Sequence, residues 1–253
     1  MLTFIMPLKS PQVCRDWAFV SRLAERSLKS VCQQTAGPFQ LLLVCHRRPQ
    51  TDFSHPSLTI IEEDFPVPGP TNEERMADKS RKLWRGLVSA RANLPGHIMF
   101  VDADDCVSRR LAGFVADQPK ANGWVFTNGY LRDQGSRWVL RKRDFHLLCG
   151  TSHILRCEPG DLPKSVEEKE SDYWIGCHGH PEMAVFMRER GTPLAPLPFP
   201  GAIYNTATTE SYSGMALRNW HSRRILLYKM LNYRLLTRSI REEYGLYEVA
   251  SSS

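Results

Sequence analysis

The sequence predicts an α/β fold with a mostly parallel, Rossmann-like sheet flanked by helices. Short apolar runs at 2–6, 39–45 and 97–101 are typical of strands that are buried on both faces. The segments between them, 16–35 and 72–93, carry apolar residues at helical spacing. An alternation of buried strands and amphipathic helices is the signature of a parallel sheet with right-handed crossover connections.

Proline, glycine and asparagine mark the ends of these elements. Pro7 stops the first strand, and the Gly-Pro pair at 37–38 breaks the first helix. A further short strand is expected at 58–61. Asn72 starts the second helix, with two glutamates in its first turn, and the Pro-Gly pair at 95–96 turns the chain into the next strand.

The second half of the chain predicts antiparallel strands and further helices. Segments 123–131 and 137–140 form an expected hairpin around Asp-Gln-Gly at 133–135, which would add antiparallel strands to the sheet. A helix is expected over 182–190, because a proline precedes it and a glycine follows. A strand is expected at 202–204.

A basic helical extension is expected at the C-terminal end. Between Met215 and Arg241 there are seven arginines and lysines and no acidic residue, and leucines and Trp220 are interleaved with them. Such a helix can lie on an anionic membrane. It can equally pack on the rest of the protein with its arginines turned towards a bound nucleotide.

Composition and charge narrow the class of protein. The net charge of +6 over 253 residues favours an anionic partner. The seven cysteines form no Cys-x-x-Cys pair, which argues against a disulfide framework and a zinc knuckle and favours a reducing compartment. The start of the chain is typical of a strand and not of a signal peptide, and no apolar run is long enough to span a bilayer. We therefore expect a soluble, cytoplasmic protein, at most peripheral to the inner face of the membrane.

Three carboxylates follow the strand at 97–101 within four positions: Asp102, Asp104 and Asp105. Carboxylates this close repel one another unless a cation or hydrogen-bond donors compensate them. Mg²⁺ and Mn²⁺ prefer oxygen ligands and complete their coordination with substrate phosphates. The alternative is that Asp104 or Asp105 caps a helix beginning near residues 107–108, although one aspartate would suffice for a cap.

Three segments of the chain resemble the GT-A glycosyltransferases that use nucleotide sugars. They are Phe4-Ile5-Met6-Pro7, the stretch Ser27-Leu28-Lys29-Ser30-Val31-Cys32-Gln33-Gln34, and Phe100-Val101-Asp102-Ala103-Asp104-Asp105. The resemblance implies a metal-dependent, hexosyltransferase-like transfer of a sugar from a nucleoside-diphosphate sugar to an acceptor hydroxyl. It implies Mn²⁺ or Mg²⁺ held by Asp102, Asp104 and Asp105, with Asp104 holding the cation against the diphosphate.

The resemblance also implies a set of nucleotide-sugar-binding residues: Pro7, Lys9, Asp78, Lys79, Lys82, Asp102, Ala103, Asp104 and Gly150. Lysine would serve there as a point charge for phosphate. Lys79 and Lys82 can also belong to the solvated face of an amphipathic helix. The second strand ends in His46-Arg47-Arg48, where the family commonly has acidic residues that read the base. The identity of the nucleotide therefore stays open.

The catalytic residues implied by the resemblance are Glu182 and His180. A carboxylate at the start of a helix can accept the proton of the acceptor hydroxyl in an inverting transfer. Glu182 can equally do no more than complement the helix dipole. The sequence Cys177-His178-Gly179-His180 could be a zinc fragment, but no second ligand pair accompanies it. One of the two histidines is expected to contact substrate or cation, or both to be hydrogen-bonded loop residues.

The resemblance implies a catalytic domain over 1–214, divided into a nucleotide-binding half, 1–105, and an acceptor half, 106–214. The basic extension then covers 215–253. One alternative is a nucleotidyltransferase, which would normally have a glycine-rich loop after the first strand, and residues 7–11 contain no glycine. Another is a non-enzymatic, basic nucleic-acid- or membrane-binding protein, which leaves the aspartate cluster unexplained. No nucleic-acid partner is expected, since no recognised motif is present.

Overall fold

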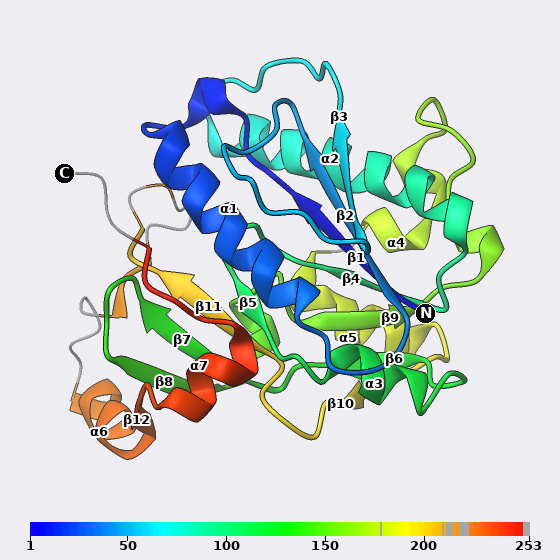
Figure 1. Cartoon of the computed structure of the whole chain (residues 1–253). Helices are drawn as coiled ribbons and strands as arrows, with labels where there is room; N and C mark the ends of the chain where they lie inside the picture. The colour runs from blue at the N-terminus through cyan, green and yellow to red at the C-terminus, as the bar shows by residue number, and fades with distance from the viewer. Residues whose placement is uncertain (178, 209, 211–214, 218–222, 250–253) are drawn as a thin grey trace.

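The computed structural model describes residues 1–177, 179–208, 210, 215–217 and 223–249. It confirms a mixed α/β fold in which a mostly parallel central sheet is flanked by helices (Figure 1). In spatial order the central sheet contains β10 (Ala195–Pro196), β6 (Gly123–Val125), β9 (His153–Arg156), β4 (His97–Phe100), β1 (Leu2–Pro7), β2 (Phe39–Cys45) and β3 (Leu58–Glu62). The run from β4 through β1 and β2 to β3 is parallel throughout, whereas β9 pairs antiparallel with β4 and β6.

A second, smaller sheet lies beside the first. Its strands, again in spatial order, are β12 (Tyr233–Leu235), β8 (Trp138–Arg143), β7 (Asn128–Asp133), β11 (Ala202–Thr206) and β5 (Cys106–Val107). The helices are α1 (Trp17–Cys32), α2 (Asn72–Ala90), α3 (Leu111–Ala116), α4 (Trp174–Cys177), α5 (His180–Glu189), α6 (Arg223–Asn232) and α7 (Arg238–Tyr244). Single 3-10 turns occur at Pro11–Val13, Arg91–Asn93, Phe145–Leu147, Pro159–Asp161 and Glu170–Asp172.

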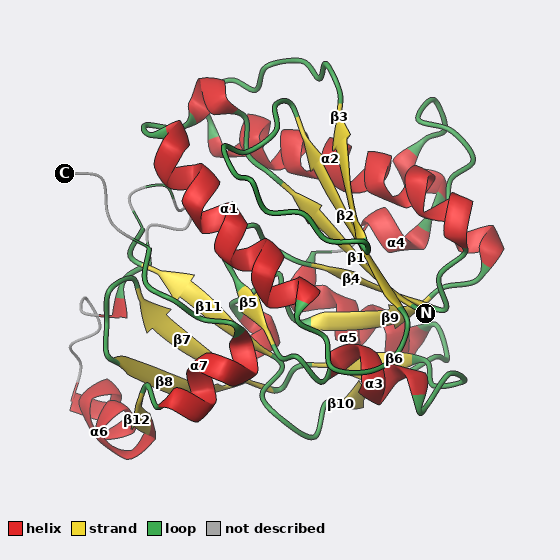
Figure 2. Cartoon of the chain, viewed as in Figure 1, coloured by secondary structure: helices red, strands yellow, loops and turns green. Residues whose placement is uncertain are grey.

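Helices cover both faces of the central sheet (Figure 2). Successive side chains of a strand point to opposite faces, so Phe4 and Met6 of β1 pack with α1 and α3, while Ile5 packs with α2, α4 and α5. Helix α2 lies close against β1 at Gly86, where a Cβ atom would be 2.4 Å from Cγ2 of Ile5. This close packing brings the N-terminal half of α2 to the carboxyl ends of β1 and β4.

The first half of the chain follows the predicted order, and the capping residues explain the helix starts. The side chain of Asp16 accepts a hydrogen bond from the backbone N–H of Phe19 at the start of α1. Thr71 and Glu74 form a reciprocal capping box at the start of α2. Both helices therefore begin within one residue of the expected position.

The expected hairpin forms only in part and in a different sheet. Strands β7 and β8 pair antiparallel as a hairpin, but they belong to the second sheet, and 123–125 is a separate strand, β6, in the central sheet. The hydrogen bond from the backbone N–H of Phe126 to the carbonyl of Ser152 continues the β6–β9 pairing, and the chain enters the second sheet only at β7. The apolar pattern of the sequence continues through 123–131, so it does not indicate that the chain changes from one sheet to the other.

The C-terminal residues complete the second sheet. Strand β12 pairs with β8, and Leu236, Tyr244 and Leu246 are buried in one cluster with Ile203 of β11. Trp220, on which the expected extension partly depends, lies outside the described residues, and the boundary at residue 214 stays a prediction. Of the helices that are described, none combines the length and the apolar character needed to cross a bilayer.

Candidate active site

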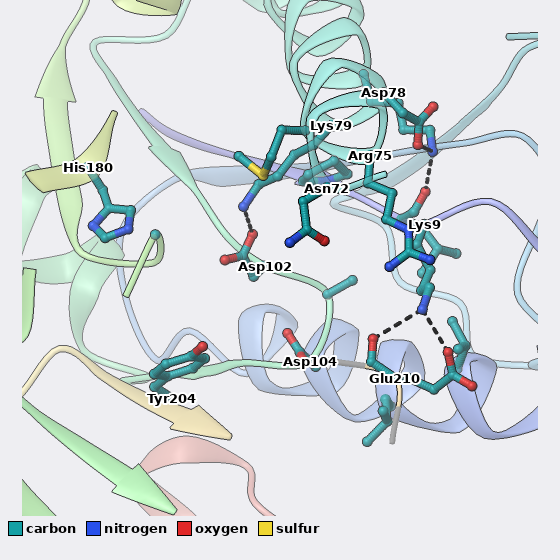
Figure 3. A pocket seen from close by; sticks show the side chains of 18 of the residues that line it. Lys9, Asn72, Arg75, Asp78, Lys79, Asp102, Asp104, His180, Tyr204 and Glu210 are labelled. Carbon is teal, nitrogen blue, oxygen red and sulfur yellow. Dashed lines mark hydrogen bonds and ion pairs between the residues drawn. The ribbon is translucent and has the colours of Figure 1, made fainter. Parts of the chain in front are cut away.

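A cavity of about 390 Å³ opens at the carboxyl ends of β1 and β4 (Figure 3). Ligands of open α/β sheets bind at this edge. The lining residues come from the end of β1, from α1 and α2, from the loops after β4 and before β9, and from α5 and β11. The polar ones among them are Lys9, Asn72, Arg75, Asp78, Lys79, Lys82, Asp102, Asp104, His180, Tyr204 and Glu210. We call this cavity the cleft.

The loop after β4 is held by contacts from several elements. The backbone N–H of Asp102 donates to Oγ1 of Thr151 at 2.9 Å, and the N–H of Asp105 donates back to the carbonyl of Asp102 at 3.0 Å. The side-chain amide of Asn205, on β11, donates to the carbonyl of Asp104 at 2.8 Å. The loop is therefore a fixed turn that presents Asp102 and Asp104 to the cleft.

Asp105 has surroundings unlike those of its two neighbours. Its side chain is fully buried, and its carboxylate accepts hydrogen bonds from Oγ1 of Thr151 at 2.7 Å, Sγ of Cys149 at 3.3 Å and the backbone N–H of Asn205 at 3.2 Å. Burial, and then the charges of Asp104 and Asp102, raise its pKa well above the usual range. It does not line the cleft. Its described contacts join the β4 loop to the loop before β9 and to β11.

Asp102 lies against Lys79 of α2, and the two side chains form an ion pair (Figure 3). Burial alone would lower the pKa of Lys79, but the carboxylates of Asp102, Asp104 and Asp105 raise it above its ordinary value. Gly150 leaves room for this pair, because a Cβ atom there would lie 2.9 Å from Oδ2 of Asp102. The absence of a side chain at residue 150 thus makes space for the carboxylate.

Asp104 is the second carboxylate that faces the cleft. Burial, and then the charge of Asp102, raise its pKa to about 6. A nearby cation would relieve both effects by favouring the ionised form. Two cleft-facing carboxylates fit Mg²⁺ or Mn²⁺, which bind through one or two carboxylates together with substrate phosphates. Within the described residues no group of three or more His, Cys, Asp or Glu side chains forms a metal site, so the metal stays a prediction.

Lys82 is buried, and its described contacts tie α2 to the end of β1. Its ammonium group donates to Oδ2 of Asp78 at 2.5 Å and to the carbonyl oxygen of Leu8 at 2.7 Å. The side chains of Lys82 and Asp78 are 1% and 3% exposed. The side chain of Lys79, in contrast, is 26% exposed. Of the two lysines, Lys79 is the better placed to meet a ligand.

The other end of the cleft is formed by Lys9 and Glu210. Nζ of Lys9 lies 2.7 Å from Oε2 of Glu210 (Figure 3). The second oxygen of Glu210 accepts hydrogen bonds from the backbone N–H groups of Arg15 and Asp16, just before α1, at 2.9 and 3.0 Å. In the view of Figure 3, Asp102 and Asp104 lie between this pair and His180.

The two predicted catalytic residues have different positions. His180 lines the cleft, and its Nδ1 lies 2.7 Å from the carbonyl oxygen of His146. A carbonyl can only accept, so Nδ1 carries a proton, and in the neutral ring Nε2 is the nitrogen with the free lone pair. Glu182 is exposed and does not line the cleft. His178, the other member of the His-x-His pair, lies outside the described residues.

The structure therefore brings all nine predicted nucleotide-sugar-binding residues, and His180, to one cavity. Those that line it are Pro7, Lys9, Asp78, Lys79, Lys82, Asp102, Ala103, Asp104, Gly150 and His180. Asn72, Arg75, Tyr204 and Glu210 also line it and were not predicted. Asn72 and Arg75 could have been found, because they are spaced one helical turn apart on the face of α2 that carries Lys79. Nothing in the sequence marks Tyr204 or Glu210.

Comparisons with known proteins give weak likenesses. No protein-family model and no curated protein matches the chain. Among solved structures, S. aureus TarS aligns at 13% identity with a TM-score of 0.41, covering 81% of this chain and 60% of that chain. TarS in complex with UDP aligns at 14% identity with a TM-score of 0.41, covering 95% of this chain and 68% of that chain. The present chain thus spans 60% of the length of the first TarS chain.

Two further structures represent different reactions. Francisella tularensis 2-C-methyl-D-erythritol 4-phosphate cytidylyltransferase (IspD) aligns at 10% identity with a TM-score of 0.40, covering 91% of this chain and 99% of that chain. The Streptococcus pneumoniae glycosyltransferase GlyE aligns at 12% identity with a TM-score of 0.39, covering 90% of this chain and 59% of that chain.

Proposed function

We propose that the protein is a metal-dependent glycosyltransferase that moves a sugar from a nucleoside-diphosphate sugar to an acceptor hydroxyl. One observation carries the proposal: the carboxylates of Asp102 and Asp104 face a cleft at the carboxyl end of β4, beside the ammonium group of Lys79, which pairs with Asp102. A diphosphate bound with a divalent cation needs both kinds of group, carboxylates for the cation and ammonium groups for the phosphate oxygens.

The cleft is suited in size and charge to the donor. Ligand pockets of small molecules typically measure about 300 to 1,000 Å³, and the cleft measures about 390 Å³. Lys9, Arg75 and Lys79 line it with positive charge. In the proposed complex these side chains bind the diphosphate, and the buried Lys82 keeps α2 and the end of β1 in place.

Asp102 and Asp104 are the residues that would hold the cation. When bound, Mn²⁺ or Mg²⁺ supplies Lewis-acid stabilisation of the negative charge on the departing nucleoside diphosphate. The buried Asp105 supports the loop that carries these two carboxylates through its hydrogen bonds with Thr151 and Asn205. The proposed metal set is therefore narrower than the three aspartates expected from the sequence.

His180 is the proposed general base. Its Nδ1–H is engaged by the carbonyl of His146, which orients the ring and leaves Nε2 able to accept the proton of an acceptor hydroxyl. Glu182 was the other candidate, and its exposed position away from the cleft favours the histidine. A base of this kind belongs to a direct, inverting displacement.

Donor hydrolysis and thermal stabilisation test the proposal together. The protein is incubated with a panel of nucleoside-diphosphate sugars and Mn²⁺, and release of nucleoside diphosphate is measured with and without candidate acceptors. Binding of donor to the folded state should raise the melting temperature in a concentration-dependent way. Asp104→Asn should lose both effects, whereas the surface variant Asp117→Asn should keep them.

The same preparations separate the proposal from a nucleotidyltransferase. That enzyme would release pyrophosphate from a nucleoside triphosphate and a sugar phosphate, and it would release no diphosphate from a nucleotide sugar. Pyrophosphate release without diphosphate release, or donor turnover unaffected by chelator and by Asp104→Asn, would overturn the proposed reaction.

A further inference from the structure

An exposed apolar patch lies on α6 and the neighbouring edge of the second sheet. It consists of Leu226, Leu227, Met230 and Leu231 on α6, Leu235 on β12 and Trp138 on β8, which are 47, 59, 79, 65, 54 and 51% exposed. We call it the α6 patch. Contiguous exposed apolar residues on a folded protein mark an interaction surface.

The patch is fixed in place by polar anchors on the inner side of α6. The hydroxyl group of Tyr228 donates to the carbonyl of Arg141 on β8 at 2.9 Å and accepts from the backbone N–H of Arg143 at 3.3 Å. Nζ of Lys229 donates to the carbonyl of Leu217. At 100° per residue, Tyr228 and Lys229 lie on one side of the helix and the four apolar residues of the patch on the other.

Strand β12 extends the apolar surface onto the sheet. Leu235 is paired in register with Trp138 across the β12–β8 ladder, and the ring of Trp138 lies 6.4 Å from that of Tyr233. Directly opposed side chains on neighbouring strands touch one another. The exposed leucine and tryptophan therefore form one surface on a rigid sheet edge.

Positive charge lies beside the patch. Nη1 of Arg234 donates to the carbonyl of Leu231 on α6 at 2.8 Å, and Nζ of Lys142 lies 6.0 Å from the centre of the Tyr228 ring. Neither 134–143 nor 223–241 contains an aspartate or a glutamate. An apolar centre with a basic margin complements a surface that carries negative charge outside and is apolar a few ångströms deeper.

We infer that the α6 patch docks the protein on an anionic lipid bilayer, with the leucines, Met230 and Trp138 entering the interface and Arg234 and Lys142 contacting lipid phosphates. Tryptophan is favoured at this depth because its ring is apolar and its indole N–H stays hydrated. This inference is independent of the reaction in the cleft, and either can fail without the other.

Vesicle flotation tests the docking. The full chain is mixed with vesicles of phosphatidylcholine alone or of phosphatidylcholine with phosphatidylglycerol. We expect binding to the anionic vesicles, and we expect it to fall as salt rises from about 0.1 to about 1 M, which shortens the screening length from about 10 to about 3 Å. Failure to float with either vesicle would overturn the inference.

A matched pair of variants ties the binding to the patch. The double variant Leu227→Glu/Leu231→Glu places charges in the interface and should weaken vesicle binding by at least about ten-fold. Leu94→Glu changes a leucine of similar exposure (53%) next to the central sheet and should bind as the wild type does. Both changes are at exposed side chains, and thermal melts confirm that the variants fold.

Two outcomes would contradict the assignment to this patch. One is an equal loss of vesicle binding in Leu94→Glu and in the double variant. The other is concentration-dependent self-association in light scattering that the double variant abolishes without changing vesicle binding. The second outcome would make the α6 patch an interface between two copies of this chain.

Discussion

Nη2 of Arg26 donates a hydrogen bond of 3.1 Å to the backbone carbonyl oxygen of Asp104. The arginine belongs to α1 and is fully buried, and its Nη1 donates to Oε1 of Gln134 at 2.9 Å. Its positive charge also opposes the effect of burial on the pKa of Asp104. Through Arg26, helix α1 thus holds the β4 loop and positions a carboxylate of the proposed cation site, although Arg26 itself does not line the cleft.

Arg26→Lys should disturb the site more than the fold. A lysine cannot reach Gln134 and Asp104 at once, because it lacks the planar fork of the guanidinium. We expect a stability loss of about 1 to 3 kcal/mol and a fall in kcat/KM of about ten-fold or more. Urea unfolding and diphosphate release measure the two quantities.

Arg132→Lys is the matched control for this change. Arg132 is also fully buried, but its described contacts are with Glu248 and the carbonyl of Ser136. The Arg132→Lys variant should lose stability and keep the kcat/KM of the wild type. An equal loss of kcat/KM in both variants would mean that Arg26 acts only through stability.

Asp104→Asn and Asp105→Asn should have opposite effects on stability. The raised pKa of Asp104 means that the folded protein holds this proton more tightly than the unfolded chain does. Protonated Asp104 therefore contributes to stability, and this contribution is fully present below about pH 4 and is lost as pH rises through about 6. Removing the charge should abolish transfer and stabilise the metal-free protein at pH 7 by on the order of 1 to 2 kcal/mol.

Asp105→Asn also removes a charge that burial disfavours, but on balance it should lower stability, because the asparagine NH₂ group replaces one of the two carboxylate oxygens and must face a donor, either Thr151 or the backbone N–H of Asn205. Chemical denaturation at pH 7 compares both variants with the wild type. Destabilisation by both substitutions to the same extent would contradict the division between a cation ligand and a structural carboxylate.

His180→Gln and Glu182→Gln distinguish the two candidates for the base. If Nε2 of His180 accepts the proton, the His180 variant should lose about a hundred-fold or more in kcat, with donor binding unchanged. Glu182→Gln should stay within a few-fold of the wild type. A reversed order of the two losses would restore Glu182 as the base, and near-normal kcat in both would favour a retaining transfer.

His153 should make stability depend on pH. Its side chain is 6% exposed, and burial, then the neighbouring His146 and His180, lower its pKa to about 3. The unfolded chain binds a proton near the ordinary value, so stability is lost as pH falls below about 6.5. The expected loss between pH 7 and pH 5 is about 2 kcal/mol. In urea titrations His153→Gln should flatten this slope.

The sequence was sufficient to predict the edge of the sheet at which the cleft lies. An apolar run followed by Asp102 and Asp104 places carboxylates at the carboxyl end of a buried strand, and helical spacing places Lys79 and Lys82 on adjacent turns. What it could not predict depends on contacts between distant residues. Asp105 directly follows Asp104 in the chain, yet contacts with the distant residues Cys149, Thr151 and Asn205 give it a structural role.

Two other features are equally invisible in the sequence. Lys9 and Glu210 are 201 positions apart, and no local pattern signals their pairing. The chain also passes from the central sheet at β6 to the second sheet at β7, and no local pattern signals the change. The helix expected at 107–108 is also wrong: residues 106–107 form β5, and α3 begins at Leu111, where neither Asp104 nor Asp105 caps it.

The charges around the cleft are balanced. Among its described lining residues, four carry a positive charge and four a negative one: Lys9, Arg75, Lys79 and Lys82 against Asp78, Asp102, Asp104 and Glu210. A dianionic diphosphate entering alone would break electroneutrality in a partly dehydrated space, and a divalent cation entering alone would break it in the other direction. We therefore expect the two to be taken up as a pair, so that each tightens the other by the same factor in titrations. In that case the apparent donor affinity would be set by the concentration of free cation.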